Sequence, residues 1–441
     1  MAKKITAAKK TVAKKTAASS PASRTKWFTE ARFGMFIHWG LYALPARHEW
    51  VRHNEQIRDE NYQKYFDTFD PDLFNAREWA AAAKAAGMKY AVLTTKHHEG
   101  FCLFDSKFTD YKSTNTPFKR DIVREYVDAF RAEGLGIGFY YSLIDWHHPD
   151  FVLDNRIGPY RDAPDRAELN KGRDQKKYAK YMRDQVTELL SNYGKVDIIW
   201  FDFSYPSAEN NPETGKGRDQ WESEKLHALV RKLQPNIIID NRLDLPGSGD
   251  IHTPEQYTPV DGIKDENGDL VVWEGCQTFS GSWGYHRDEQ TWKSAEMLVQ
   301  MLVNTVALGG NLLMNVGPTS RGELDYRAKD ALKVYADWMH ANARSIYGAT
   351  MSQYDAPADC RFTQNGNRLY LHLYAWPFRD IALKGMAGKI EYAQLLHDGS
   401  EILFTEKDAE WNDKVGDGDI MLRLPVVKPN VVVPVIELFL K

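Results

Sequence analysis

The chain has 441 residues, a formal net charge of −4 and 43% hydrophobic residues, which suffices for one large domain and a smaller one. No apolar run reaches the roughly 18–20 residues that span a bilayer, so we expect no membrane partner. Three cysteines, Cys102, Cys276 and Cys360, without a CxxC pair argue against a disulfide framework or a Cys-rich zinc site, and they suit a reducing cytoplasm.

Residues 1–26 form a basic N-terminal segment that differs from the rest of the chain. They contain eight Lys or Arg and no acidic residue, and they lack the apolar core of a secretory signal. Interleaved Lys, Ala and Thr predict a disordered, solvated tail. Removing these eight positive charges from the net −4 leaves −12 for the remainder, so we expect no nucleic-acid partner. A role of the tail in binding nucleic acid or a surface is the alternative.

From residue 33 onward, apolar runs alternate with helical patterns, and glycines often separate the two. The predicted helices are 75–87, 121–133, 173–193, 220–233, 291–308 and 325–346. Asn75, followed by Glu78 three residues later, predicts a capped start for the first of them. The predicted strands are 33–40, 88–98, 137–142, 196–203, 236–242, 271–278 and 311–317.

The predicted strands are continuous apolar runs rather than alternating ones, which is typical of a parallel sheet that is buried on both faces. Seven or eight strand–helix units over about 320 residues favour a (β/α)8-like barrel, and we assign it to residues 27–348. No GxGxxG motif opens the first unit, which argues against a doubly wound nucleotide-binding sheet.

The pattern changes near residue 350. Residues 361–374 read as a hairpin around an Asn365-Gly366 turn, and residues 431–440 read as a strand. No helical pattern of note lies between them. We therefore predict an antiparallel β-sandwich domain over residues 349–441.

Polar and aromatic residues gather at the predicted strand ends. They are His38, Trp39, His97, His98, Tyr141, Trp200, Asp202 and Arg242. Ligands of parallel α/β folds bind at this end of the strands. The His97–His98 pair raises the alternative of a metal-dependent hydrolase or isomerase. However, neighbouring strand residues point to opposite faces, and the chain has no HExxH motif, so we expect no metal.

A retaining glycosidase needs two carboxyl groups about 5–5.5 Å apart, one as nucleophile and one as acid/base. Asp202, at the end of the apolar run Ile198–Phe201, suits the first role, with Arg242 and the histidines available to keep it charged. Glu255 and Glu274 are the candidates for the second role. The residues alone leave these two at even odds.

Six blocks, in unbroken order over residues 25–345, resemble the α-L-fucosidases of glycoside hydrolase family 29. The blocks are FGMFIHWG (33–40), KHHEGFC (96–102), YYS (140–142), WFD (200–202), WEGC (273–276) with SWGY (282–285), and GNLLMNVGP (310–318). Members of that family have a (β/α)8-like barrel followed by a β-sandwich, in agreement with the patterns above.

The resemblance implies a retaining exo-α-L-fucosidase that acts on fucosylated oligosaccharides or glycoconjugates through a covalent fucosyl-enzyme and needs no cofactor or metal. It implies Asp202 as nucleophile and selects Glu255 over Glu274 as acid/base. The substrate-binding residues that it implies are His38, Glu49, Trp50, His97, His98, Tyr141, Trp200, Arg242 and Trp283.

This sequence departs from the family pattern directly after the nucleophile. Many members have Asp-Gly there, whereas this chain has Asp202-Phe203-Ser204. The departure leaves linkage preference open, as the sequence leaves the aglycone, transfer activity and oligomeric state. A non-catalytic carbohydrate-binding protein on the same barrel is the alternative function.

Overall fold

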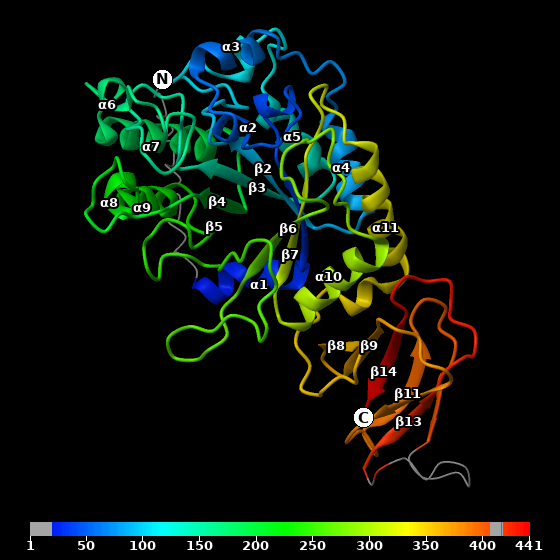
Figure 1. Ribbon diagram of the computed structural model, residues 1–441. Helices are drawn as coiled ribbons and strands as arrows, with labels where there is room; N and C mark the ends of the chain where they lie inside the picture. Colours follow the sequence, from blue (N-terminus) through cyan, green and yellow to red (C-terminus); the bar gives the residue numbers. More distant parts are fainter. Residues whose placement is uncertain (1–19, 406–415, 417) are drawn as a thin grey trace, which may run out of the picture.

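The computed structural model describes residues 20–405, 416 and 418–441. An α/β body carries the N-terminal and central parts of the chain, and a smaller all-β body follows it at the C-terminal end (Figure 1). Most of the predicted basic tail, residues 1–19, lies outside the described residues. Among the helices in the described part of the chain, none is both long and apolar enough to cross a membrane.

Seven parallel strands form the central sheet in the order β5-β4-β3-β2-β1-β7-β6. Their bounds are β1 Phe33–Ile37, β2 Tyr90–Lys96, β3 Gly136–Ser142, β4 Ile198–Asp202, β5 Ile238–Ile239, β6 Glu274–Thr278 and β7 Asn311–Val316. All the predicted strands are present, although β5 is far shorter than predicted. The sheet curls so that β5 and β6 form its two edges.

Residues 251–255 lie between these two edge strands. Ile251 pairs in parallel with Asp240 just after β5, and Glu255 pairs in parallel with Cys276 of β6. Pro254 cannot donate a backbone hydrogen bond, which is one reason why the segment is irregular. Residues 251–255 therefore supply an eighth parallel segment that completes the barrel, with Glu255 at its C-terminal end.

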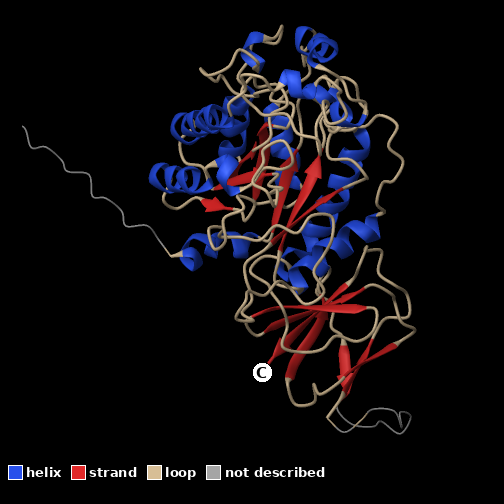
Figure 2. Cartoon of the chain, turned by 60° about the vertical axis from the view of Figure 1, so that its left-hand side comes forward, coloured by secondary structure: helices blue, strands red, loops and turns tan. Residues whose placement is uncertain are grey.

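Helices surround the barrel (Figure 2). The longer ones are α3 Asp59–Asp67, α4 Ala76–Ala85, α5 Ile122–Ala132, α7 Gln175–Asn192, α9 Ser223–Leu233, α10 Ala295–Ala307 and α11 Tyr326–Asn342. Short helices occur in the connections: η1 Leu41–Ala43, α2 Val51–Asn54, η2 Ser113–Asn115, α6 Arg166–Leu169, α8 Arg218–Trp221 and η3 Ala343–Ser345. Asn75 caps α4 as predicted, because its side chain accepts a hydrogen bond from the Arg77 N–H and donates to Glu78.

A helix that the sequence did not predict, α1 Pro21–Ala31, begins inside the segment assigned to the tail. Its Phe28 ring lies 5.3 Å from that of Tyr90 in the barrel interior, and Arg24 forms an ion pair with the buried Asp250. The expected tail boundary at residue 26 is therefore wrong, since the folded part begins at least as early as Pro21.

Side chains from alternate strand positions fill the barrel. The inner cluster consists of Phe28, Ala31, Phe36, Tyr90, Val92, Tyr140, Ile198, Trp200, Ile238, Ile251, Cys276 and Leu313. Gly34 makes room for one of these rings, because a Cβ at this position would stand only 2.4 Å from a ring carbon of Tyr90.

The C-terminal body contains two antiparallel sheets, of order β10-β13-β12 and β11-β14-β9-β8. Its strands are β8 Cys360–Asn365, β9 Arg368–Leu373, β10 Asp380–Leu383, β11 Ile390–Leu395, β12 Leu403–Thr405, β13 Ile420–Arg423 and β14 Val435–Leu440. The predicted hairpin is present, with Gly366 at a φ of 57° in its turn. The indole of Trp338 on α11 donates to the Val433 carbonyl at 3.1 Å and ties this body to the barrel.

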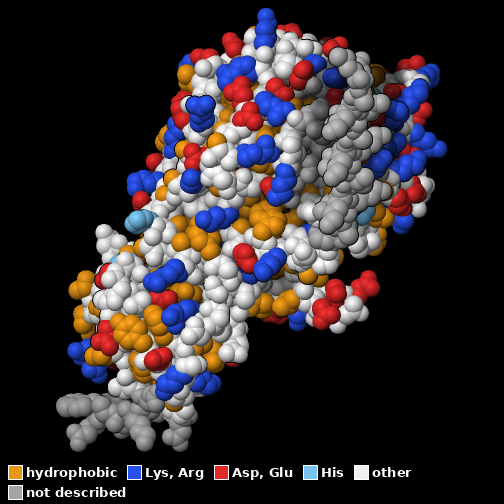
Figure 3. Space-filling view, turned by 180° about the vertical axis from the view of Figure 1, so that it is seen from behind, with side chains coloured by type: hydrophobic (Ala, Val, Ile, Leu, Met, Phe, Trp, Pro, Cys, Tyr) orange, Lys and Arg blue, Asp and Glu red, His pale blue; other side chains and the backbone are white. Residues whose placement is uncertain are grey.

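Charges of both signs are mixed on one face of the molecule. On the face seen from behind, Lys and Arg side chains are interspersed with Asp and Glu over the α/β part (Figure 3). This face therefore shows no continuous basic surface among the residues that are drawn in colour.

Candidate active site

A pocket opens at the C-terminal ends of the barrel strands, where the sequence places the polar residues. It is lined by Phe36, His38, Glu49, Trp50, His97, His98, Tyr140, Trp200, Asp202, Phe203, Glu255, Cys276 and Trp283. Arg242 stands beside it and contacts two of its carboxylates. The structure thus brings the predicted site residues together, apart from Tyr141 and Glu274.

Two neighbours hold the carboxylate of Asp202, the last residue of β4. Its Oδ1 accepts a hydrogen bond from Arg242 Nη1 at 2.8 Å, and its Oδ2 accepts one from the Tyr140 hydroxyl at 2.7 Å. His98 Nε2 lies 3.9 Å from the same Oδ2. Burial acts to lower the pKa of Arg242, but the adjacent Asp202 carboxylate raises it above its ordinary value, so the guanidinium keeps its charge.

Glu255, at the end of the segment of residues 251–255, contacts the guanidinium of Arg242. Its Oε2 lies 2.8 Å from Arg242 Nη1, the atom that also contacts Asp202. The two contacting oxygens are therefore no more than twice that distance apart, which is compatible with the separation of about 5–5.5 Å in retaining glycosidases. Thr253 fixes the guanidinium, because its Oγ1 and carbonyl accept from Nε and Nη2 at 3.0 and 3.1 Å.

Glu274, the other candidate carboxylate, does not line the pocket. It points into the barrel from the start of β6, two residues before Cys276, and it is fully buried. The Tyr90 hydroxyl donates a hydrogen bond to it, and burial raises its pKa to about 7. The structure therefore places Glu255, and not Glu274, beside Asp202.

The two tyrosines of β3 point to opposite sides of the sheet. Tyr140 lines the pocket, whereas the Tyr141 hydroxyl donates to Gln185 of α7 at 2.7 Å on the outer side of the barrel. The expectation that Tyr141 contacts a ligand is therefore corrected to Tyr140. The error is a shift of one residue along a strand, which reverses the face of every side chain.

His97 and His98 both line the pocket, and their ring centroids lie only 4.0 Å apart. The prediction that they face opposite sides is wrong, because both follow Lys96, the last residue of β2, and strand alternation no longer applies there.

Fixed hydrogen bonds determine the tautomers of two pocket histidines. His38 Nδ1 lies 2.6 Å from Asn315 Oδ1, and the Asn315 amide N–H donates onward to a backbone carbonyl. His98 Nδ1 lies 2.7 Å from the Ser142 hydroxyl, which itself donates to a backbone carbonyl. Nδ1 therefore carries the hydrogen in both rings, and Nε2 is left as an acceptor. Burial lowers the pKa of both histidines to about 3, so they are neutral at pH 7.

Glu49 adds a carboxyl group to the pocket whose hydrogen-bond partners differ in kind from those of Asp202. Its Oε2 accepts hydrogen bonds from the backbone N–H groups of Trp283 and Gly284 at 3.1 and 2.8 Å, whereas Oε1 has no hydrogen-bond partner among the described residues. Burial raises the pKa of Glu49 to about 7. Near neutral pH this side chain can therefore either donate or accept a hydrogen bond.

Aromatic rings form much of the pocket wall. Trp283 packs against His38 with ring centroids 5.1 Å apart, and Trp50 packs against His98 at 5.0 Å. Phe203 completes this wall, 5.3 Å from Trp50. Its φ of 80° lies in the left-handed region that favours glycine.

Phe36, Tyr140, Phe203 and Cys276 line the pocket but were not predicted. Strand alternation provides the signal for one of them, because Tyr140 pairs with Trp200 and Ser142 pairs with Asp202 in the parallel register of β3 and β4. Tyr140 must share the inward face of Trp200. Phe203 gave no comparable signal, since its orientation depends on an unusual backbone angle.

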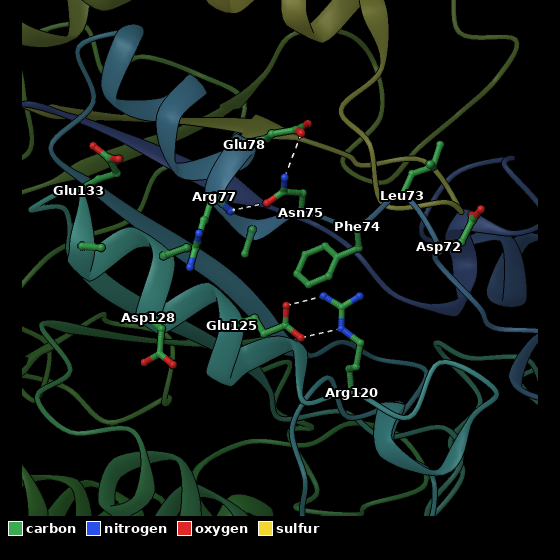
Figure 4. Close-up of a pocket in the computed structure, with 13 residues that line it drawn as sticks. Asp72, Leu73, Phe74, Asn75, Arg77, Glu78, Arg120, Glu125, Asp128 and Glu133 are labelled. Atoms are coloured by element: carbon green, nitrogen blue, oxygen red, sulfur yellow. Dashed lines mark hydrogen bonds and ion pairs between the residues drawn. The ribbon is translucent and has the colours of Figure 1, made fainter.

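A larger hollow of about 860 Å³ lies outside the barrel, against α4 and α5 (Figure 4). It contains none of the predicted site residues. Arg120 and Glu125 pair across it, and Asn75 bonds Glu78 at its edge. Asp72 and Glu133 pair with Arg321 and Lys84, and the hollow resembles a surface groove between helices rather than a reactive site.

Comparisons with known proteins identify relatives of this chain in sequence and in structure. The chain is 31% identical over 352 residues to the plasma α-L-fucosidase of Homo sapiens, covering 73% of this chain and 68% of that protein. It superimposes on α-L-fucosidase isoenzyme 1 from Paenibacillus thiaminolyticus with a TM-score of 0.89 and 46% identity, covering 96% of this chain and 99% of that one.

A third relative is a family 29 α-L-fucosidase from Bacteroides thetaiotaomicron, solved as a trapped covalent intermediate with 2-fluoro-fucosyl fluoride in a glutamate-to-glutamine mutant. It is 27% identical, with a TM-score of 0.79, and the match covers 96% of this chain and 97% of that one. The family model for α-L-fucosidases matches residues 1–344. The chain belongs to the α-L-fucosidase family.

Proposed function

We propose that this protein is a retaining exo-α-L-fucosidase, which removes terminal α-L-fucosyl residues from glycans through a covalent fucosyl-enzyme. The observation that carries the proposal is the pair of carboxylates, Asp202 and Glu255, at one guanidinium in a pocket of the barrel. The trapped covalent intermediate of the Bacteroides relative supports the same two-step course.

In the first step, an oxygen of Asp202 attacks the anomeric carbon while the bond to the leaving oxygen breaks. The electron pair of that bond stays with the leaving oxygen, which takes a proton from Glu255. In the second step, Glu255 removes a proton from water, and the water oxygen displaces Asp202 from the anomeric carbon. Two inversions give net retention, and the enzyme is restored.

Asp202 is prepared for this role by its fixed donors. Tyr140 and Arg242 hold its two oxygens, so little reorganisation is needed when the carboxylate attacks. As the covalent bond forms, its negative charge disappears, and Arg242 remains available to Glu255. Arg242 can therefore stabilise the negative charge of Asp202 before the covalent bond forms and that of Glu255 afterwards.

The polar wall suits a sugar with three hydroxyl groups. His38 and His98 offer neutral acceptors at Nε2, and Glu49 offers its Oε1, which makes no hydrogen bond among the described residues and lies 3.2 Å from His48 Nδ1. Fucose also carries a methyl group at C6, which requires an apolar surface. Trp50, Trp283 and Phe36 supply aromatic surface in the same pocket.

The test is hydrolysis of an aryl α-L-fucoside and of a panel of fucosylated oligosaccharides, with the released sugar followed by NMR. We expect L-fucose as the sole sugar released from the non-reducing end, and we expect its α anomer to appear first. Release of the β anomer first would contradict retention. Binding of fucose by calorimetry without hydrolysis would instead favour the non-catalytic alternative.

A metal-dependent hydrolase is the other rival that the histidines suggest. Full activity after prolonged EDTA treatment and dialysis would dismiss it, whereas loss of activity that is restored by a divalent metal would support it.

A further inference from the structure

Trp283 belongs to a long connection that has little regular structure of its own. The structure describes residues 279–294 throughout, and they join β6 to α10 without a helix or a strand. Such a connection holds a side chain in one place only where other parts of the fold bind its backbone. The position of the Trp283 wall of the pocket therefore depends on contacts with neighbouring segments.

The backbone of this connection passes very close to two neighbours. A Cβ at Gly317, directly after β7, would stand 2.7 Å from the carbonyl carbon of Gly284 and 2.8 Å from the carbonyl oxygen of Trp283. A Cβ at Gly284 would stand 2.9 Å from a ring carbon of Tyr42. Only glycine permits these approaches. Trp283 and Gly284 therefore lie between the end of β7 and the segment that follows β1.

Two buried side chains bind the Trp283 peptide group, one at each end. Glu49 accepts a hydrogen bond from its N–H at 3.1 Å, and Asn315 Nδ2 donates to its carbonyl oxygen at 2.6 Å. Asn315 lies near the end of β7, is only 2% exposed and stands outside the lining of the pocket. It can therefore affect a bound sugar only through the residues that it contacts.

The contact with Trp283 also determines the tautomer of His38. A backbone carbonyl can only accept, so the nitrogen of the Asn315 amide must face Trp283 and its oxygen must face His38. That oxygen lies 2.6 Å from His38 Nδ1, which must carry the hydrogen and leave Nε2 as an acceptor. Without the Trp283 carbonyl, the amide would be free to turn over, and the two ring nitrogens would exchange their roles.

We infer that Asn315 is a positioning residue for the proposed hydrolysis, because it holds Trp283 in place and keeps His38 Nε2 ready to accept from a fucose hydroxyl. The two rings that it positions pack against each other, with centroids 5.1 Å apart. A single amide thus couples an aromatic wall of the pocket to a polar one. This inference rests on the proposed function and adds to it a residue outside the pocket.

The test measures kcat/KM of the full-length protein on an aryl α-L-fucoside with an activated leaving group. Asn315→Leu keeps the approximate size of the side chain and removes both hydrogen bonds. Asn311→Leu is the matched control, since Asn311 is buried at the other end of the same strand and its amide donates to the Phe28 carbonyl at 2.7 Å, away from the pocket. His38→Phe, alone and combined with Asn315→Leu, completes a double-mutant cycle.

We expect Asn315→Leu to lower kcat/KM about 10–100-fold, as small displacements of binding groups do. Asn311→Leu should stay within about threefold of wild type, although both variants should lower the melting temperature. If Asn315 acts through His38, the loss that Asn315→Leu causes should be at least about threefold smaller in the His38→Phe background than in the wild type.

Three results would overturn the inference: a loss of the same size in both backgrounds, equal losses in the Asn315 and Asn311 variants, or an Asn315→Leu variant with the kcat/KM of the wild type. If Asn315→Leu does not fold, Asn315→Ala, which leaves room for a water molecule, gives the same comparison. Failure of the wild type to hydrolyse the fucoside would overturn the proposed function, and this inference with it.

Discussion

Asp202 and Glu255 are bound to the same nitrogen atom, Nη1 of Arg242, each at 2.8 Å. The relationship links two distant parts of the barrel. Asp202 ends β4, whereas Glu255 ends the irregular segment that closes the sheet against β6. Each carboxylate is followed by a non-glycine residue with positive φ, Phe203 at 80° and Gln256 at 60°. Both chains therefore turn sharply immediately after the reacting group, as is common where backbone strain accompanies function.

The two candidate acid/base residues can be separated by leaving-group dependence. Glu255→Gln should lower kcat/KM for disaccharides by roughly 100-fold or more, because a sugar leaving group needs protonation, as general acid catalysis typically provides. On α-L-fucosyl fluoride the same variant should lose far less of the wild-type kcat/KM, since fluoride departs without a proton.

Glu274→Gln is the matched control for this comparison. Its side chain bonds Tyr90 beneath the pocket, so we expect kcat/KM to stay within about threefold of wild type on both donors. A strong, leaving-group-dependent loss in Glu274→Gln, with Glu255→Gln near normal, would reverse the assignment.

The adjacent tyrosines of β3 provide a second matched pair. Tyr140→Phe removes a hydrogen bond to Asp202 and should lower kcat about 10–100-fold with little change in melting temperature, as hydrogen bonds to charged groups contribute about 1.5–3 kcal/mol. Tyr141→Phe leaves Gln185 unsatisfied and should instead cost about 1–3 kcal/mol of stability with normal kinetics. Kinetic loss confined to Tyr141→Phe would restore the original expectation.

The buried Glu274 should make stability depend on pH. Burial raises its pKa from 4.5 to about 7, so the folded state keeps a proton that the unfolded state releases between these values. Its contribution to stability is therefore fully present below about pH 4.5 and is lost as the pH rises through about 7. Glu274→Gln should gain stability relative to wild type on going from pH 5 to pH 8.

Urea unfolding at several pH values measures this difference. The expected change is of the order of 3 kcal/mol across the window, because each pKa unit corresponds to about 1.4 kcal/mol. A wild type and variant whose difference in unfolding free energy is constant from pH 5 to pH 8 would show that Glu274 does not titrate as described.

Much of the fold could be predicted because long, regular elements carry strong patterns. The helix after Asn75 and the strand that ends at Asp202 depend on capping and on apolar runs, both of which are local. The closing segment of residues 251–255 could not be recognised, since it contains a proline and pairs only through isolated bridges. Glu255 thus stands at the end of a barrel segment that the sequence did not predict.

Other differences have similar physical causes. The first part of α1, up to Lys26, was assigned to the tail because the basic composition continues through Arg24 and Lys26, whereas the anchors of the helix are the remote Asp250 and Tyr90. The position of Phe203 depends on backbone strain that the surrounding loop stabilises, which no pattern of residue types reveals. Contacts between residues far apart in the chain thus determine these positions, and local sequence patterns do not reveal them.

The most direct measurement is covalent labelling with 2-fluoro-fucosyl fluoride, the reagent that trapped the intermediate of the Bacteroides relative. After brief incubation, proteolysis and mass spectrometry should locate a single 2-fluoro-fucosyl adduct on the peptide that contains Asp202, and Asp202→Asn should show none. An adduct on another carboxylate, or normal hydrolysis by Asp202→Ala, would contradict the assignment of Asp202 as nucleophile.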